Sequence, residues 1–140
     1  MIVFEGDYVL KECLEQVYPY ASQILIAEGP VKYWQEKGRS TSTDDTNDIL
    51  NNFPDPENKI TIVHGQYSEK DEQCNAYIEH MRPDIDYLWN LDSDEVYKKE
   101  DIEKTGLLFN PKFPQNWTNN QMKTLDMLLS NCVKYEGQTI

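Results

Sequence analysis

Four short apolar runs alternate with segments of helical periodicity in the amino-terminal two thirds of the chain. The runs cover residues 1–4, 24–26, 60–63 and 87–91. Between them, apolar residues recur at the i, i+3, i+4, i+7 spacing of an amphipathic helix, most clearly over residues 10–17. Short strands separated by helices are typical of a sheet whose strands run parallel. We therefore predict an α/β, Rossmann-like fold with a parallel sheet covered on both faces.

The character of the sequence changes near residue 105. We expect residues 1–105 to form one domain. Residues 106–120 are rich in Gly, Pro and Asn, as in a linker, and residues 120–133 repeat apolar residues at helical spacing. The 106–140 segment is therefore predicted to be a linker and an amphipathic helix that begins another domain. Because its last residues look like an interrupted strand, we expect the chain to be truncated.

Charge and composition exclude several classes of partner. The chain has 25 Asp and Glu against 13 Lys and Arg, a net charge of −12, so it offers no basic face to nucleic acid. No apolar run approaches the ~18 residues that would suggest a membrane span, and no signal peptide is evident. We expect a soluble, cytoplasmic protein without membrane insertion. Cys13 and Cys74 fall at apolar helix positions and are expected in the core, with Cys132 too distant to complete a zinc motif.

Polar residues follow each predicted strand. Glu5, Glu28, His64 and Asp92 come at or just after the four strand ends. In an open parallel sheet, ligands bind beyond the carboxyl ends of the strands, so these side chains are expected to share one edge. Asp92 and Asp94 form a DxD pattern whose two carboxylates suit Mg²⁺ or Mn²⁺, ions that keep open positions for water and substrate phosphates. The sequence thus predicts a divalent metal at Asp92 and Asp94.

Several motifs, in the right order, resemble family 2 glycosyltransferases, whose fold is called GT-A. The family's first strand ends in Asn-Glu before a helix of the form xxLxxCLxS, and here the Glu matches but the Asn does not. An acid ends the second strand, a Ser-x-Asp-x-Thr segment follows, an Asn lies in the third helix, and a strand leads into DxD. The matching residues are Glu5 with Leu10, Cys13 and Leu14, then Glu28, residues 42–46, Asn75, and residues 86–95. An insertion over residues 30–41 lengthens the spacing between the second-strand acid and the Ser-x-Asp-x-Thr segment.

The resemblance implies that the chain is the donor-binding half of a glycosyltransferase, which uses a nucleotide-sugar and an acceptor that is a glycan, a lipid or a protein. By the family pattern, Glu5, Glu28 and Asp44 would contact the nucleoside, and Asn75 would belong to the donor site. Asp92 would lie near the ribose or donor sugar, and Asp94 would hold the metal.

Each of these residues also has a simpler interpretation. Glu5 could be an exposed acid, Asp44 a helix cap and Asn75 a solvent-facing residue. His64 could be a hydrogen-bonded residue at a strand end.

Two residues of the insertion have a possible functional role. Trp34 and Arg39 could cover the bound donor.

Catalysis is unassigned by the sequence. An inverting transferase needs a general base for the acceptor hydroxyl, and the family supplies it from the half that follows the DxD. That half has no counterpart in the 46 residues after Asp94. One alternative is a degenerate domain that binds a nucleotide or a metal without transfer. Another is a haloacid dehalogenase phosphatase, whose DxDx[TV] pattern fits Asp92 to Val96 with Asp92 as nucleophile.

Overall fold

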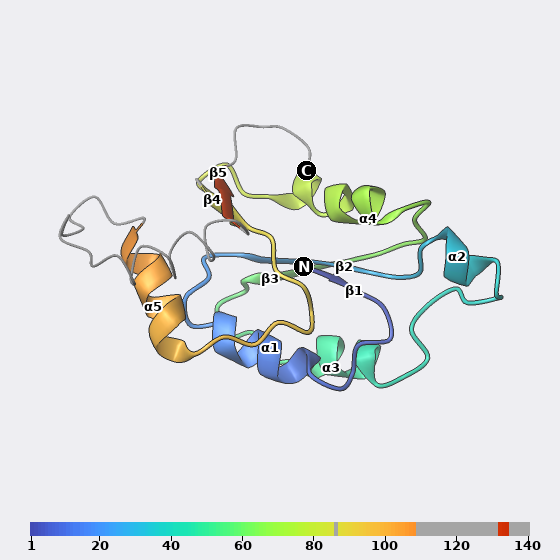
Figure 1. The fold of residues 1–140 in the computed structure, drawn as a ribbon, viewed down its shortest axis with the longest axis horizontal. Coiled ribbons are helices and arrows are strands. Elements are labelled where there is room, and N and C mark those ends of the chain that lie inside the picture. Colours follow the sequence, from blue (N-terminus) through green and yellow to red (C-terminus); the bar gives the residue numbers. More distant parts are fainter. Residues whose placement is uncertain (86, 109–131, 135–140) are drawn as a thin grey trace.

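A parallel three-stranded sheet forms the centre of the molecule (Figure 1). The computed structural model describes residues 1–85, 87–108 and 132–134, with side chains for 1–85 and 87–104. The strands lie in the order β1-β2-β3, and they are β1 (Ile2–Val3), β2 (Ile24–Glu28) and β3 (Ile60–His64). The predicted α/β fold with a parallel sheet is confirmed.

Helices cover both faces of this sheet. Figure 1 shows α1 and α3 on one side and α4 on the other, with α2 beyond the carboxyl ends of β1 and β2. The helices are α1 (Leu10–Val17), α2 (Lys32–Gln35), α3 (Thr46–Asn52), α4 (Lys70–Ala76) and α5 (Lys99–Leu108), and a 3₁₀ turn, η1 (Ile78–His80), follows α4. None of the helices that the structure describes is long and apolar enough to cross a bilayer.

The buried strand β2 divides the core into two layers. Its residues are buried throughout, and because side chains alternate along a strand, Ile24 and Ile26 join the cluster under α1 and α3, while Leu25 and Ala27 join the cluster under α4. Cys13 is fully buried in the first cluster, as predicted. Burial raises the pKa of the Cys13 thiol to about 11, so this cysteine is a packing residue and not a nucleophile.

The fourth apolar run does not join the parallel sheet. It forms β4 (Tyr87–Trp89), which pairs antiparallel with β5 (Cys132–Lys134), so the expected fourth parallel strand is wrong in its pairing. Side chains from the run still pack on the main core: Leu91 enters the α1 layer and Leu88 the α4 layer. Burial of its apolar residues therefore places this segment near β1 without a hydrogen-bonded ladder.

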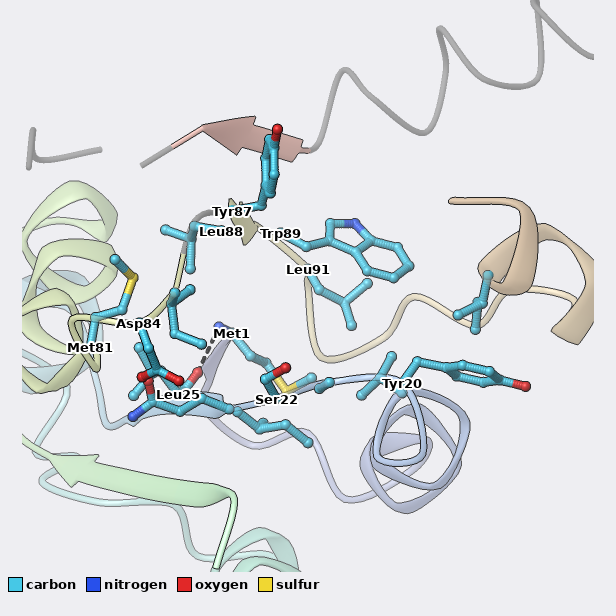
Figure 2. A pocket seen from close by; sticks show the side chains of 16 residues that line it. Met1, Tyr20, Ser22, Leu25, Met81, Asp84, Tyr87, Leu88, Trp89 and Leu91 are labelled. Atoms are coloured by element: carbon cyan, nitrogen blue, oxygen red, sulfur yellow. Dashed lines mark hydrogen bonds between the residues drawn. The ribbon is translucent and has the colours of Figure 1, made fainter. Parts of the chain in front are cut away.

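A cavity of about 440 Å³ lies between this segment and the amino ends of the main strands. Figure 2 shows Leu88 and Trp89 on one side of it and Met1 and Leu25 on the other. β1 pairs with residues 27 and 28 of β2, and the carbonyl of Leu25 accepts a hydrogen bond from the amino-terminal ammonium of Met1 at 2.9 Å. The cavity lies at the end of the sheet opposite the predicted site.

Two local expectations need correction. Residues 106–108, expected to begin a linker, belong to α5, and residues 109–120 of the expected linker lie outside the described residues. The helix predicted over 120–133 is wrong at its end, where Cys132 and Val133 are in β5; its other residues lie outside the described part of the chain.

Candidate functional site

The carboxyl ends of the three parallel strands bring Glu5, Glu28 and His64 to one edge, as predicted. The register sets Val3 beside Glu28, and Glu28 beside His64. Glu5 follows two residues after Val3. We call this region, with the bonded segment 39–46, the carboxyl edge.

Glu28 is buried at this edge and fully engaged in hydrogen bonds. Its exposed fraction is 1%. Oε1 accepts from the backbone N–H of Ser42 at 2.9 Å, and Oε2 lies 3.0 Å from Nδ1 of His64. A carboxylate that loses this much water needs such partners. Glu28 therefore fixes the 42–46 segment to the sheet and orients His64, whose side chain is half exposed.

Two glycines allow the ends of β2 and β3 to approach this closely. Gly29 has a φ of +142°, and a Cβ placed there would lie 1.9 Å from the carbonyl oxygen of Gly65. The backbone N–H of Gly65 in turn donates to the carbonyl of Glu28 at 3.0 Å. Only glycine fits at Gly29, both for its conformation and for the space around it.

Glu5 is bonded to the segment that carries the Ser-x-Asp-x-Thr motif. Its carboxylate accepts from the backbone N–H groups of Thr43 at 2.9 Å and Asp44 at 3.2 Å, and it forms an ion pair with Arg39. Glu5 itself has a φ of +52°, an uncommon conformation for a residue with a side chain. Such backbone strain is found most often at functional sites. Glu5 is thus only partly exposed, and the interpretation as a free surface acid does not hold.

The backbone of the β1–α1 loop is bonded to the same segment. Backbone N–H groups of Glu5 and Gly6 donate to Oγ of Ser42 at 3.0 Å and to Oγ1 of Thr46 at 2.8 Å. Thr46 is fully buried and Ser42 nearly so. The two hydroxyls therefore join two stretches of chain that lie about 40 residues apart in sequence.

Asp44 completes this network at the start of α3. It accepts from the backbone N–H groups of Asp7 at 3.1 Å and Thr46 at 3.0 Å. Partial burial alone would raise the pKa of Asp44, but the hydrogen bonds from Thr46 and Asp7 outweigh it, so its pKa lies below the ordinary value. The bond to Thr46 lies at the start of α3, but the residue at the cap position is Asp45, so the alternative in which Asp44 caps the helix is met only in part. An ionised carboxylate remains at the edge.

The DxD loop, residues 92–95, is held by its backbone while its two aspartates stay exposed. Sγ of Cys13 lies 3.6 Å from the carbonyl oxygen of Asp92, and Nε2 of Gln16 donates to the carbonyl of Glu95 at 2.6 Å. Both anchoring side chains come from α1. The side chains of Asp92 and Asp94 lie in solvent. Sequence reasoning missed Gln16, whose polar side chain lies on the helix that also carries the apolar stripe.

A contact between loops places the DxD beside the carboxyl edge. The hydroxyl of Tyr8 donates to Oδ2 of Asp94 at 3.2 Å. A Cβ on Gly6 would lie 3.5 Å from Oγ of Ser93. The β1–α1 loop therefore touches the Ser-x-Asp-x-Thr segment on one side and the DxD loop on the other.

Helix α4 contributes a residue that was not predicted. Nε2 of Gln73, which is buried, donates to the carbonyls of Ala27 at 3.0 Å and Gly29 at 3.1 Å, and it lies 3.4 Å from the carbonyl of Val3. Asn75, the predicted residue, is half-buried and donates within its own helix to the carbonyl of Asp71 at 2.7 Å. Gln73 was overlooked because a glutamine inside a helical pattern gives no signal of its burial.

The insertion also reaches the carboxyl edge. Besides its ion pair with Glu5, Arg39 donates to Oγ1 of Thr43 at 2.7 Å. The ring of Trp34 lies 6.0 Å from the ring of Phe4, the residue that follows β1. The insertion therefore adds a cation and an aromatic ring next to the acids.

A divalent metal fits the donor set of the DxD loop only in part. Within the described residues, no cluster of three or more His, Cys, Asp or Glu side chains is arranged to hold an ion. Asp92 and Asp94 supply carboxylate oxygens, and Mg²⁺ is commonly held by one or two carboxylates with water and substrate phosphates. Asp92 and Asp94 are therefore the residues that could hold such an ion, with water and a phosphorylated ligand supplying its other ligands.

Comparison with known proteins identifies the family. No curated protein and no solved structure matches the chain significantly. The model of glycosyl transferase family 2 matches residues 40–109, half of the chain. The matched stretch includes Asp44, Asn75 and both aspartates of the DxD, whereas Glu5 and Glu28 precede it. The parallel α/β sheet and the order of these motifs agree with the match, and the chain belongs to glycosyl transferase family 2.

Proposed function

We propose that the chain binds a nucleotide-sugar donor across the carboxyl edge and takes part in transfer of its sugar. The nucleoside lies over the ends of β1 to β3, and the diphosphate lies toward the DxD loop. The observation that carries this proposal is the contact between loops: through Tyr8 and Gly6 the DxD loop lies directly beside the β1–α1 loop, which carries Glu5 and is bonded to Asp44. One extended ligand can then reach both the carboxyl edge and the DxD loop.

Electrostatics make binding depend on a metal. The edge carries the carboxylates of Glu5, Asp44, Asp92 and Asp94, and an anionic diphosphate would be repelled by them. Family 2 enzymes commonly use a divalent metal, and Mn²⁺ or Mg²⁺ would neutralise charge on the diphosphate as it leaves. Asp94 would hold the ion, with Asp92 as a second ligand or near the ribose. Arg39 supplies a protein cation on the other side.

The remaining donor residues have distinct proposed tasks. Glu5 and Asp44 shape the nucleoside side, because each carboxylate bonds backbone groups of the facing loop. Glu28 is buried and contributes indirectly, because its carboxylate holds Ser42 and His64 in position. Asn75 belongs to the donor site by the family pattern. The proposal covers donor binding and assigns no general base; the acceptor is a glycan, a lipid or a protein.

Calorimetric titration tests the proposal. UDP, GDP and inorganic pyrophosphate are added with and without Mn²⁺ to the wild type, to Asp94→Asn and to Glu79→Gln. Glu79 is an exposed acid in η1 and serves as the matched control. We expect metal-dependent binding of one nucleoside diphosphate, weakened at least about 10-fold by Asp94→Asn and unchanged by Glu79→Gln. A wild type that binds none of these compounds with Mn²⁺ would refute the proposal.

A binding module without transfer is the second candidate. It is favoured by the DxD loop, where the described residues provide two exposed carboxylates and no third ligand. Metal-dependent binding without donor hydrolysis or transfer to any acceptor would support it. The phosphatase alternative conflicts with family membership, because that superfamily carries its DxDx[TV] on the first strand whereas three parallel strands precede the motif here.

A further inference from the structure

His64 stands out at the carboxyl edge because it is half exposed yet held by a buried carboxylate. Its side chain is 52% exposed, whereas that of Glu28 is 2% exposed. Nδ1 of His64 lies 3.0 Å from Oε2 of Glu28. The family resemblance implies that Glu28 contacts the nucleoside. A buried acid with partners on both oxygens cannot make that contact directly, whereas the histidine above it can.

The pairing decides which nitrogen of the ring carries the proton. The other oxygen of Glu28 already accepts from the backbone N–H of Ser42 at 2.9 Å. An ionised carboxylate only accepts hydrogen bonds, so Nδ1 of His64 must donate. In neutral His64 the lone pair is then on Nε2, which becomes an acceptor on the exposed part of the ring.

The position of His64 in the sheet suggests what this acceptor meets. The DxD loop lies beside the β1–α1 loop, whereas His64 ends β3, two strands away in the order β1-β2-β3. Neighbouring strands are about 4.8 Å apart, so His64 lies roughly 10 Å across the sheet from the end of β1. It is therefore at the end of the proposed donor site that is remote from the metal and the diphosphate.

We propose that Nε2 of His64 accepts a hydrogen bond from a ring N–H of the donor's nucleobase, and that Glu28 is a positioning residue that fixes the tautomer. This inference rests on the proposed function. Uracil and guanine carry a ring N–H on the edge where cytosine and adenine carry a bare, accepting nitrogen. An accepting Nε2 therefore favours uracil or guanine and disfavours the other two bases.

Nucleotides that differ in whether the base carries this ring N–H test whether His64 recognises it. UDP, CDP, GDP, ADP and pyrophosphate are titrated with Mn²⁺ into the wild type, His64→Ala and His80→Ala. His80, the other histidine of the chain, is exposed in η1 and is the matched control. We expect His64→Ala to weaken binding of the preferred nucleotide about 3- to 10-fold, the worth of one hydrogen bond. Pyrophosphate binding should not change, and His80→Ala should match the wild type.

Nitrogen-15 NMR of the two histidines tests the role of Glu28. In the wild type we expect neutral His64 to carry its proton on Nδ1. In Glu28→Gln, the side-chain amide can keep the bond to Ser42 and turn its NH₂ toward His64, so the proton should move to Nε2. Nε2 would then donate, and the preference for UDP over CDP, or for GDP over ADP, should shrink or reverse. If Glu28 had a purely structural role, neither the tautomer of His64 nor the nucleotide preference would change in Glu28→Gln.

The outcomes separate this inference from the proposed function. A wild type that binds no nucleoside diphosphate with Mn²⁺ overturns both. Metal-dependent binding that His64→Ala leaves unchanged overturns only the role of His64. An equal loss for pyrophosphate, or a wild-type tautomer protonated on Nε2, also overturns it. Loss confined to nucleotides with a ring N–H, together with the tautomer change in Glu28→Gln, supports it.

Discussion

The carboxyl edge and the DxD loop lie side by side but are built in opposite ways. At the edge, the carboxylates of Glu5, Glu28 and Asp44 all accept hydrogen bonds from backbone N–H groups of residues 42–46, or from the facing loop. In the DxD loop, α1 holds the backbone, and Asp92 and Asp94 extend into solvent. The carboxylates of the edge are therefore already bonded to the backbone before a ligand binds, whereas those of the DxD loop are exposed, with Tyr8 donating to Asp94.

This difference matches the demands of the two parts of the proposed donor. A nucleoside is recognised by shape and a few directed hydrogen bonds, which rigid groups provide at little entropic cost. A metal diphosphate needs negative charge that is not already neutralised. Acids at the edge thus act mainly by holding the loops in place, and acids in the DxD loop are available for binding. Substitutions in the two regions should consequently affect different measurements.

The largest expected effect comes from the glycine at the edge. Gly29→Ala places a methyl group against the carbonyl of Gly65 in a backbone conformation that alanine avoids. We expect a loss of about 3–4 kcal/mol in the free energy of unfolding, measured by urea denaturation. Gly38→Ala is the control, because Gly38 also has a positive φ of +80° but no atom within 4 Å of its added Cβ. It should lose only about 1 kcal/mol. Equal losses would contradict the importance of the close approach.

Removal of the buried carboxylate should have the next largest effect. Glu28→Ala removes the hydrogen-bond partner of the backbone N–H of buried Ser42 and that of Nδ1 of half-exposed His64. We expect a loss of about 3 kcal/mol in the free energy of unfolding. Glu28→Gln, which retains hydrogen-bonding atoms, should lose about 1 kcal/mol by the same measurement. If the alanine variant is as stable as the glutamine variant, the edge is not organised through Glu28.

A smaller effect is expected where α1 anchors the DxD loop. Gln16→Ala removes the bond to the carbonyl of Glu95 and another from the backbone N–H of Tyr97. We expect a loss of about 1–2 kcal/mol in stability. Binding of the Mn²⁺ nucleotide should also weaken, because the loop is less fixed. Gln66→Ala, at an exposed position, is the control. Unchanged stability in Gln16→Ala would show that the loop is positioned by its apolar neighbours alone.

The smallest effect is a pH dependence at Asp44. Its pKa in the folded protein lies below the ordinary value of 3.8, so its ionised form stabilises the folded state. This stabilisation is complete above the unfolded pKa and is lost as pH falls through the folded value. The stability difference between wild type and Asp44→Asn should therefore shrink as pH is lowered from 5 to 2. Denaturation series at several pH values measure it. A constant difference would mean that the hydrogen bonds do not depend on the charge.

Much of the fold was predictable because hydrophobic periodicity reports local structure. The predicted helix over residues 10–17 and the predicted strands over 24–26 and 60–63 are all present, because burial demands an apolar stripe along a helix and apolar runs in buried strands. The pairing of β4 was not predictable. An apolar run indicates a buried strand, but it does not say which neighbour provides the hydrogen bonds.

Part of the site was predictable for a similar reason. Topology alone brings Glu5, Glu28 and His64 to one edge, because the carboxyl ends of parallel strands meet there. Which of these side chains is buried and which is exposed depends on hydrogen bonds to residues distant in sequence. Nothing in the sequence distinguishes the exposed Asp92 from the buried Glu28, and Gln16 and Gln73 have no pattern that marks them as partners of distant carbonyls.

The sequence by itself determined the family, the parallel α/β plan and the gathering of acids at one edge, because these follow from residue type and spacing. Tertiary structure alone decided which carboxylates are bonded to backbone N–H groups and which are exposed to solvent, where a ligand can reach them. The physical reason is that burial and hydrogen bonding of a carboxylate depend on segments distant in sequence. At this site residues 39–46 meet the end of β1, and α1 meets the DxD loop, only in the folded chain.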